Sequence, residues 1–213
     1  MRFDEFLDIY KDKPFIDSST FPGYLENQEM LRIQVSQWRK KQYLIKLKKG
    51  LYVFSEKYRK IEINMEFIAN FLVNPSYISL EYALNFYSLI PERVFTVTSI
   101  TTKKTQSYSN SLGFFSYSSI KKELFLGYEF IKIQNYTVVI ALKEKALIDY
   151  FYFNKNKFDE SIESFNEMRF QNLETLNMSK LKEFSKKYPQ KIQKTVNLFI
   201  KYARLEKKSY SSL

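Results

Sequence analysis

Along the first 55 positions the spacing of apolar residues is first that of helices and then that of β-strands. The segment FDEFLDIY, residues 3–10, has apolar side chains three and four positions apart, which is the spacing of one helix face, and Lys13-Pro14 ends it. The next segment, FIDSSTFPGYL, mixes turn residues with apolar ones and has room for one short helix. From Asn27, a good N-cap, a further helix is predicted, with one apolar stripe formed by Leu31, Val35, Trp38 and Gln42.

The period changes to two after Tyr43. Two short β-rich runs, residues 44–47 and 51–54, flank the sequence Lys48-Lys49-Gly50, and this arrangement predicts a hairpin. The order helix, short helix, helix, hairpin is that of a winged helix-turn-helix. A charged run, Glu56 to Lys60, follows, and we place the domain boundary there. Residues 1–57 are therefore expected to form a winged helix-turn-helix DNA-binding domain.

The remaining residues, 58–213, predict a larger mixed α/β domain with a helical tail, so the fold class is α+β. Helices are expected over INMEFIANFLV, which ends before Pro75, and over SLEYALNFYSL, with Ser79 as N-cap and Pro91 as its end. The runs VFTVTSIT, GFFSYSSI, YEFIKI and TVVIAL predict strands. KEKALIDYFYF predicts an amphipathic helix with Ala146, Leu147 and Tyr150 inward. Three more helices are expected, around Phe165, Phe184 and Phe199.

The positive charge of the chain is local. The net charge is +11, and the residues from Arg32 to Lys60 hold ten basic residues and one acidic residue, a net charge of +9. Such a concentration of positive charge is typical of proteins that contact phosphates. The alternative hypothesis is a pure interaction module, in which the charge serves only a protein partner. Steep salt dependence of DNA affinity would separate these two hypotheses.

Several classes of chemistry are excluded because the sequence has neither cysteine nor histidine. A disulfide framework, a Cys/His zinc site and Ser–His–Asp or Cys–His nucleophiles are impossible without these residues. Carboxylates, lysine and tyrosine remain. The N-terminus lacks a signal-peptide pattern and no apolar run approaches the length of a membrane span, so we expect a cytoplasmic protein that has no membrane partner and needs no cofactor or metal.

The predicted basic helix has a polar face opposite Leu31, Val35 and Trp38. A helical rotation of about 100° per residue places Glu29, Ile33, Ser36 and Lys40 on that face. We predict that side chains there and in the wing contact DNA, with Arg32 the best candidate for reading bases in the major groove. The predicted DNA-binding residues are Arg32, Ser36, Gln37, Arg39, Lys40, Lys48 and Lys49. Lys103 and Lys104 are candidates for an additional basic surface, with a solvated polar loop as the alternative interpretation. Trp38 is expected to be core rather than a stacking platform.

Two blocks of sequence resemble the AbiEi-type antitoxins of type IV toxin–antitoxin systems, which act in abortive infection, a form of phage defence. They are LRIQVSQWRKKQYLIKLKKGLYVF and the stretch that begins PSYISLEYALNFYSLIPERVF and continues to ALKEKALIDYFYF. The resemblance covers about residues 15–153. It departs at Gln42, where the family often has glycine.

The resemblance implies two tasks. The winged helix would bind double-stranded DNA at inverted repeats in its own promoter and act as a transcriptional repressor of a two-gene operon. The C-terminal domain would oppose a nucleotidyltransferase-like toxin without a stable complex. An alternative is a stand-alone winged-helix regulator. A metal-dependent nuclease is a further alternative, because Glu144-Lys145 follows a strand and Glu129 and Asp149 are available to hold Mg²⁺. We expect a protein that is not an enzyme.

Overall fold

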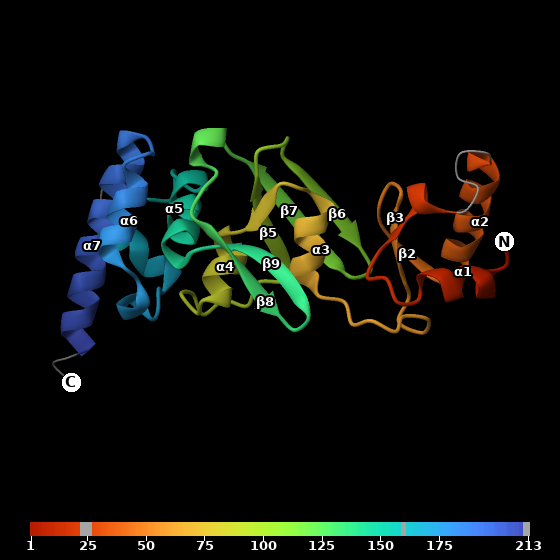
Figure 1. Ribbon diagram of the computed structural model, residues 1–213. Helices are drawn as coiled ribbons and strands as arrows, with labels where there is room; N and C mark the ends of the chain where they lie inside the picture. Colours follow the sequence, from red (N-terminus) through yellow and green to blue (C-terminus); the bar gives the residue numbers. More distant parts are fainter. Residues whose placement is uncertain (22–26, 159–160, 211–213) are drawn as a thin grey trace.

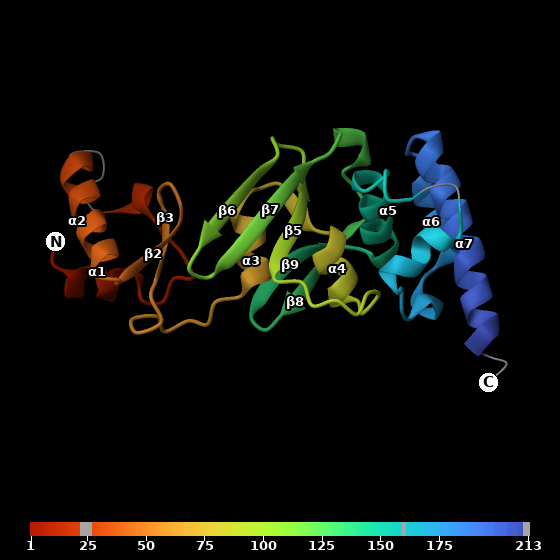
Figure 2. The same ribbon diagram turned by 180° about the vertical axis from the view of Figure 1, so that it is seen from behind.

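The computed structural model describes residues 1–21, 27–158 and 161–210, and it is a mixed α+β fold. Its elements follow one another along the molecule nearly in chain order (Figure 1). Helices α1 and α2 lie at one end with the N-terminus, a six-stranded sheet occupies the middle, and α6 and α7 lie at the other end. The reverse view in Figure 2 gives the same order.

The N-terminal part consists of two helices and a small sheet. Its elements are α1 (Phe3–Tyr10), β1 (Ile16–Asp17), the 3-10 helix η1 (Ser18–Thr20), α2 (Gln28–Lys40), β2 (Leu44–Lys48) and β3 (Leu51–Phe54). The strands pair antiparallel in the order β1-β3-β2. Both expected helices and the hairpin are therefore present. The short helix expected in residues 15–25 is η1, and Pro22-Gly23 lies outside the described residues.

The predicted apolar stripe of α2 is buried, except at its last member. Leu31, Val35 and Trp38 pack with α1, and the Trp38 ring lies 4.5 Å from the Phe6 ring, between centroids. Trp38 is thus a core residue, as predicted. Gln42 was expected on this stripe, but α2 ends at Lys40 and Gln42 is exposed with φ 58°. The chain turns there so that the Tyr43 amide can donate to the Trp38 carbonyl at 2.8 Å.

The β2–β3 hairpin is shared between two hydrophobic cores. Leu44 and Phe54 belong to the core of the N-terminal part, whereas Leu47, Leu51 and Val53 belong to the larger core of the molecule. Gly50 has φ 79° at the hairpin turn, and a side chain there would meet Ser18 Oγ at 3.1 Å. The hairpin is therefore buried on two sides and joins both parts.

The central sheet has the strand order β6-β7-β5-β4-β9-β8. Its strands are β4 (Ser76–Ile78), β5 (Thr96–Thr101), β6 (Gln106–Asn110), β7 (Gly113–Ser119), β8 (Tyr128–Ile133) and β9 (Tyr136–Ala141). The β4–β9 and β5–β7 pairs are parallel and the other neighbours are antiparallel. Strand β6 is an edge strand, and β2 of the small sheet runs beside it.

Two of these six strands were not predicted. Strand β4 is a three-residue strand buried throughout, too short to show a period. Strand β6 has the sequence QSYSN, whose polar residues are those of a loop. Its pairing with β7, rather than any apolar alternation, makes it a strand. The other four strands agree with the prediction.

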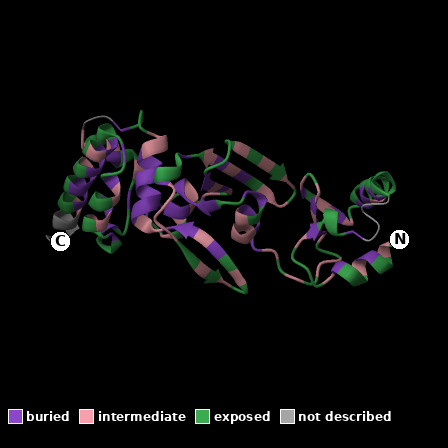
Figure 3. Ribbon diagram, turned by 45° about the horizontal axis from the view of Figure 1, so that its top comes forward, coloured by how far each residue is buried: buried purple, intermediate pink, exposed green. Residues whose placement is uncertain are grey.

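Helices cover the sheet and form the C-terminal end. They are α3 (Met65–Leu72), α4 (Leu80–Phe86), α5 (Lys143–Phe153), α6 (Met178–Ser185) and α7 (Gln190–Tyr210), with short 3-10 helices η2 (Lys122–Leu124), η3 (Glu163–Met168) and η4 (Leu173–Thr175). Helix α5 packs between α4 on one side and α6 and α7 on the other. Its buried surface is continuous around the helix (Figure 3).

Two expectations about these helices were wrong. KEKALIDYFYF is not amphipathic, because every residue from Glu144 to Phe151 is buried. The helix after Ser79 ends at Phe86, well before Pro91, since Ser88 has φ 56°. The helix expected around Phe165 is present as the 3-10 helix η3.

Candidate nucleic-acid interface

The solvent-facing side of α2 carries every residue that was predicted there. The side chains in question are exposed, and the apolar stripe turns the other way into the core. They are Arg32, Ser36, Gln37, Arg39 and Lys40. No hydrogen bond or ion pair within the described residues engages the Arg32, Arg39 or Lys40 side chain. These cations are therefore available to an external anion.

The same face also exposes two apolar side chains and one acid. Met30 is 60% exposed and Ile33 is 54% exposed, although both are large hydrophobic residues. Apolar side chains on a helix that enters the major groove can contact thymine methyl groups. Glu29 is exposed in the first turn of the helix, where its negative charge interacts favourably with the positive end of the helix dipole.

The hairpin tip does not point into solvent in the way the sequence suggested. Lys48 Nζ donates to the Leu72 carbonyl at the end of α3, at 2.8 Å. Burial, followed by the charge of Lys103, lowers the pKa of Lys48. Of the two predicted wing lysines only Lys49 is exposed. Of the two lysines at the tip, only Lys49 is therefore presented, because Leu47 and Lys48 anchor the tip to the larger core.

The second predicted basic surface, Lys103 and Lys104, lies in the connection between β5 and β6 and is exposed. The charge of Lys103 contributes, after burial, to the lowered pKa of Lys48. The aromatic residues of the central part are divided between core and surface. Phe115 and Tyr117 are 1% exposed, whereas Phe86, Phe95, Phe114 and Phe130 are 42%, 73%, 58% and 69% exposed.

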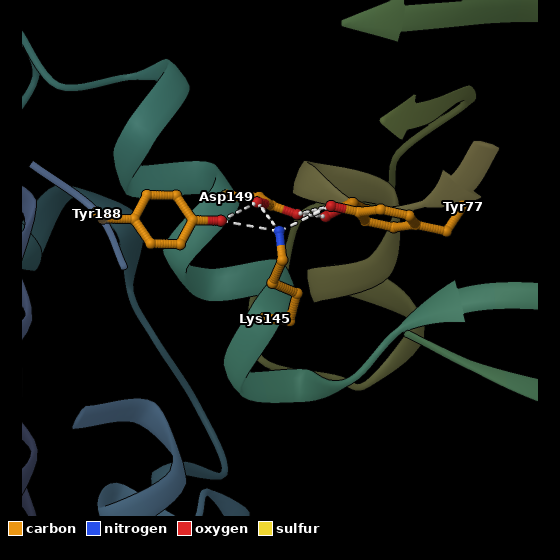
Figure 4. A network of polar contacts seen from close by, with 5 residues as sticks. Tyr77, Lys145, Asp149 and Tyr188 are labelled. Carbon is orange, nitrogen blue, oxygen red and sulfur yellow. Dashed lines mark hydrogen bonds and ion pairs between the residues drawn. The ribbon is translucent and has the colours of Figure 1, made fainter. Parts of the chain in front are cut away.

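A buried polar network occupies the junction between the sheet and the C-terminal helices (Figure 4). Lys145 and Asp149, one turn apart on α5, form an ion pair in which both side chains are fully buried. Lys145 Nζ also donates to the Tyr77 and Tyr188 hydroxyls, at 2.7 and 2.8 Å. Asp149 accepts from Tyr188 at 2.9 Å, from Tyr77 at 3.0 Å and from Ser79 at 2.9 Å.

This network satisfies both charges. The three ammonium protons of Lys145 each have an acceptor, and the four lone-pair positions of Asp149 each have a donor. Burial lowers the pKa of Lys145 and raises the pKa of Tyr77 and Tyr188. Ser79 was predicted as a capping residue of α4, but its hydroxyl donates to Asp149 and makes no cap bond.

The acids of the nuclease hypothesis are separated in the structure. Asp149 is paired with Lys145 inside the protein, and Glu144 accepts from the Asn177 amide at 2.8 Å. Glu129 is exposed and accepts from the Tyr87 hydroxyl at 3.4 Å. Among the described residues there is no group of three acidic side chains placed to hold a metal ion. The Lys145–Asp149 pair is a fully satisfied structural element.

No protein-family model and no curated protein sequence matches the chain. Within the part of the chain that the structure describes, no helix has both the length and the apolar character needed to cross a bilayer.

Proposed function

We propose that the chain is a cytoplasmic DNA-binding transcriptional regulator whose N-terminal part is a winged helix-turn-helix, with α2 as the helix that enters the major groove. The observation that carries the proposal is the outer face of α2, where Arg32, Arg39 and Lys40 are exposed and unpaired within the described residues. The element order and the antiparallel β1-β3-β2 sheet support it.

The two sides of α2 are matched to two tasks. Leu31, Val35 and Trp38 fix the helix on its core, so its outer face is held at a defined angle. Arg32 lies near the N-terminal end of that face, and arginine donates two parallel bonds to guanine. Lys40 lies two turns further on, where a backbone phosphate is the expected partner. Base reading is thus assigned to the start of α2 and phosphate contact to its end.

The test is binding of the full chain to a duplex from the promoter of its own gene and to a random duplex, measured by fluorescence anisotropy. Wild type should bind the promoter duplex more tightly, with an affinity that falls steeply between low and physiological salt. Arg32→Ala should weaken promoter binding by about 5–150-fold, equivalent to 1–3 kcal/mol, and random binding much less.

Arg204→Ala on α7 is the matched control, because Arg204 is also an exposed helical arginine and lies at the opposite end of the molecule (Figure 1). Promoter affinity unchanged in Arg32→Ala would remove this residue from the site. A salt-independent affinity for both duplexes would instead favour a module that binds a protein partner.

We further propose, on the sequence resemblance alone, that the regulator is the antitoxin of a type IV toxin–antitoxin operon. Its DNA-binding part would repress the promoter, and residues 58–213 would oppose a nucleotidyltransferase-like toxin without a stable complex. Co-expression with the neighbouring gene product tests this. The Arg32→Ala variant should lose repression and still restore growth. If the wild-type chain does not restore growth with any adjacent gene product, the antitoxin proposal is wrong and a stand-alone regulator is the remaining interpretation.

A further inference from the structure

A cleft of about 1040 Å³ opens beside the C-terminal end of α2. One wall is formed by the end of α2, by β2 and by the segment that follows β3. The opposite wall is the end of β6 with the start of the β6–β7 turn, residues 109–111. Three members of the proposed DNA-binding face, Ser36, Arg39 and Lys40, line the near edge. The cleft is thus continuous with the outer face of α2.

Its lining selects a polyanion rather than an apolar ligand. Five exposed cations line it, with one acid, Glu56. The cations are Arg39, Lys40, Lys41, Lys46 and Lys57. Small-molecule pockets of about 300–1,000 Å³ are usually lined by apolar and aromatic side chains with only a few polar groups. Here Tyr43, Leu44, Ile45 and Tyr58 also line the cleft, but the five cations set it apart from such a pocket. Lysines and arginines that flank hydroxyl groups instead suit the sugar–phosphate backbone.

The far wall supplies polar groups without charge. Ser109 at the end of β6 and Ser111 in the turn that follows are exposed. Asn110 between them accepts from the Leu112 amide at 2.9 Å through Oδ1, and its Nδ2 atom is buried and has no partner within the described residues. This wall belongs to the central sheet and is brought to α2 because β2 runs beside the edge strand β6.

We infer that this cleft binds the phosphate backbone of the same duplex that α2 reads, so that one DNA-binding surface spans the N-terminal part and the central sheet. Lys46 and Lys57 are the new contacts. This inference rests on the proposed function. It goes further in placing the β6–β7 turn next to the DNA, which DNA binding by the winged helix-turn-helix alone does not require.

The experiment compares the full-length double variant Lys46→Ala/Lys57→Ala with wild type on the promoter and random duplexes, over a range of salt concentrations. Each lost phosphate contact lowers the slope of log affinity against log salt by about 0.9, so the double variant should lose up to about two units on both duplexes. The control is Lys186→Ala/Lys187→Ala, which removes the same charge from two exposed lysines near the opposite end.

A second variant tests the far wall. Ser111→Glu places a carboxylate at the turn and should weaken binding to both duplexes at low salt. The affinity should recover at high salt, because salt screens the repulsion between the carboxylate and the phosphates. Ser179→Glu, on α6, should bind like wild type, since Ser179 is exposed and outside the cleft. Equal weakening by both substitutions would mean that general repulsion, and not the cleft, is responsible.

The failures of the two proposals are distinguishable. If Lys46→Ala/Lys57→Ala keeps the wild-type salt slope while Arg32→Ala loses promoter preference, the cleft inference is overturned and the regulator stands. If wild type itself shows no salt-dependent duplex binding, both fall. If a single-stranded RNA of equal length displaces the duplex, and does so through Lys46 and Lys57, the cleft is an RNA site and the assignment to DNA is wrong.

Discussion

Removing one charge of the buried Lys145–Asp149 pair should be among the most damaging single changes in this chain. Asp149→Asn keeps the side-chain shape but leaves the Lys145 ammonium, which is 0% exposed, without a counter-charge. Breaking a buried ion pair in this way costs about 3–5 kcal/mol. For a chain of this length each kcal/mol lowers Tm by about 2–4 °C, so a drop of roughly 6–20 °C is expected.

The magnitude follows from the connections of the network. Tyr77 is in β4, the pair is in α5, and Tyr188 lies between α6 and α7. Tyr188→Phe removes one donor to the carboxylate and one acceptor of the ammonium, while both charges stay paired. Its cost should be about 1–3 kcal/mol, the desolvation penalty of unsatisfied groups, and therefore smaller than that of Asp149→Asn.

The assay is urea unfolding followed by far-UV circular dichroism, applied to a double-mutant cycle of Lys145→Met and Asp149→Asn. The double variant has no uncompensated charge, so its destabilisation should be smaller than the combined effect of the single variants by about 2 kcal/mol or more. The exposed pair Arg169–Glu92 provides the control, since its side chains are 67% and 43% exposed and Glu92→Gln should cost about 0–1 kcal/mol.

The cycle also has a refuting result. Additivity of the two single variants within about 0.5 kcal/mol would mean that the charges do not interact in the folded protein. In that case it would be wrong that α5 can be buried because its charges are paired and hydrogen-bonded. A loss below about 1 kcal/mol for Asp149→Asn would lead to the same conclusion.

Four further outcomes are expected. Trp38 fluorescence and far-UV circular dichroism should report one coincident urea transition, because the hairpin is buried in both cores; two separated transitions would contradict this coupling. Above pH 10.5 the free energy of unfolding should fall as tyrosinate absorbance appears, by about 1.4 kcal/mol per pH unit for each tyrosine whose folded-state pKa is raised by burial, among them Tyr77, Tyr117 and Tyr188. Their stabilisation is complete below the unfolded pKa near 10 and is lost at higher pH, whereas Lys145, whose folded pKa is lowered, adds no slope once its unfolded form is neutral. Gln42→Gly should raise the free energy of unfolding by about 0.5–1 kcal/mol, because glycine adopts φ 58° without strain, while the control Gln37→Gly inside α2 should lower it by about 1 kcal/mol; a loss at Gln42 would refute the strain argument. Lys49→Ala should reduce the salt slope of duplex binding by about one unit and Lys48→Ala should leave it unchanged, since the Lys48 amine is held by Leu72; equal slopes for the two variants would count against this difference.

The parts that the sequence predicted well are those with a regular apolar period and a boundary residue. The stripe of Leu31, Val35 and Trp38 identified both the helix and its buried face, and Gly50 marked the hairpin turn. Strands β5, β7, β8 and β9 were found because β-branched and aromatic residues fill them. In each case local sequence preference and tertiary burial agree.

Where sequence reasoning failed, the deciding interaction comes from a distant segment. Strand β6 is polar and forms because β7 supplies its hydrogen-bond partners. Helix α5 was read as amphipathic because it contains Glu144, Lys145 and Asp149, yet all three are buried. Their partners, Tyr77, Ser79, Asn177 and Tyr188, lie far away in the sequence and have no recognisable spacing relative to α5.

The candidate interface shows the same division. The α2 residues were assigned to the solvent side from helical rotation alone, and they are exposed. Lys48 was misplaced because a lysine at a hairpin tip is ordinarily solvated, and nothing local indicates the Leu72 carbonyl. The cleft with Lys46 and Lys57 was missed for a related reason: its far wall comes from the β6–β7 turn, and β6 itself was not predicted.

The shared hairpin gives a physical reason for combining a highly charged helix with a larger body. A net charge of +9 between Arg32 and Lys60 repels itself, and the N-terminal core that must hold it contains few buried side chains. Burial of Leu47, Leu51 and Val53 in the larger core adds about 1.5–3 kcal/mol each to the stability that holds the hairpin in place. A fragment that starts at residue 61 loses these three contacts and also uncovers the β6 edge beside β2, so it should be less stable than the same residues in the full chain and more prone to association. If that fragment instead unfolds at the same urea concentration as the full chain, and remains monomeric, the hairpin contributes nothing to the larger core and the two parts are independent.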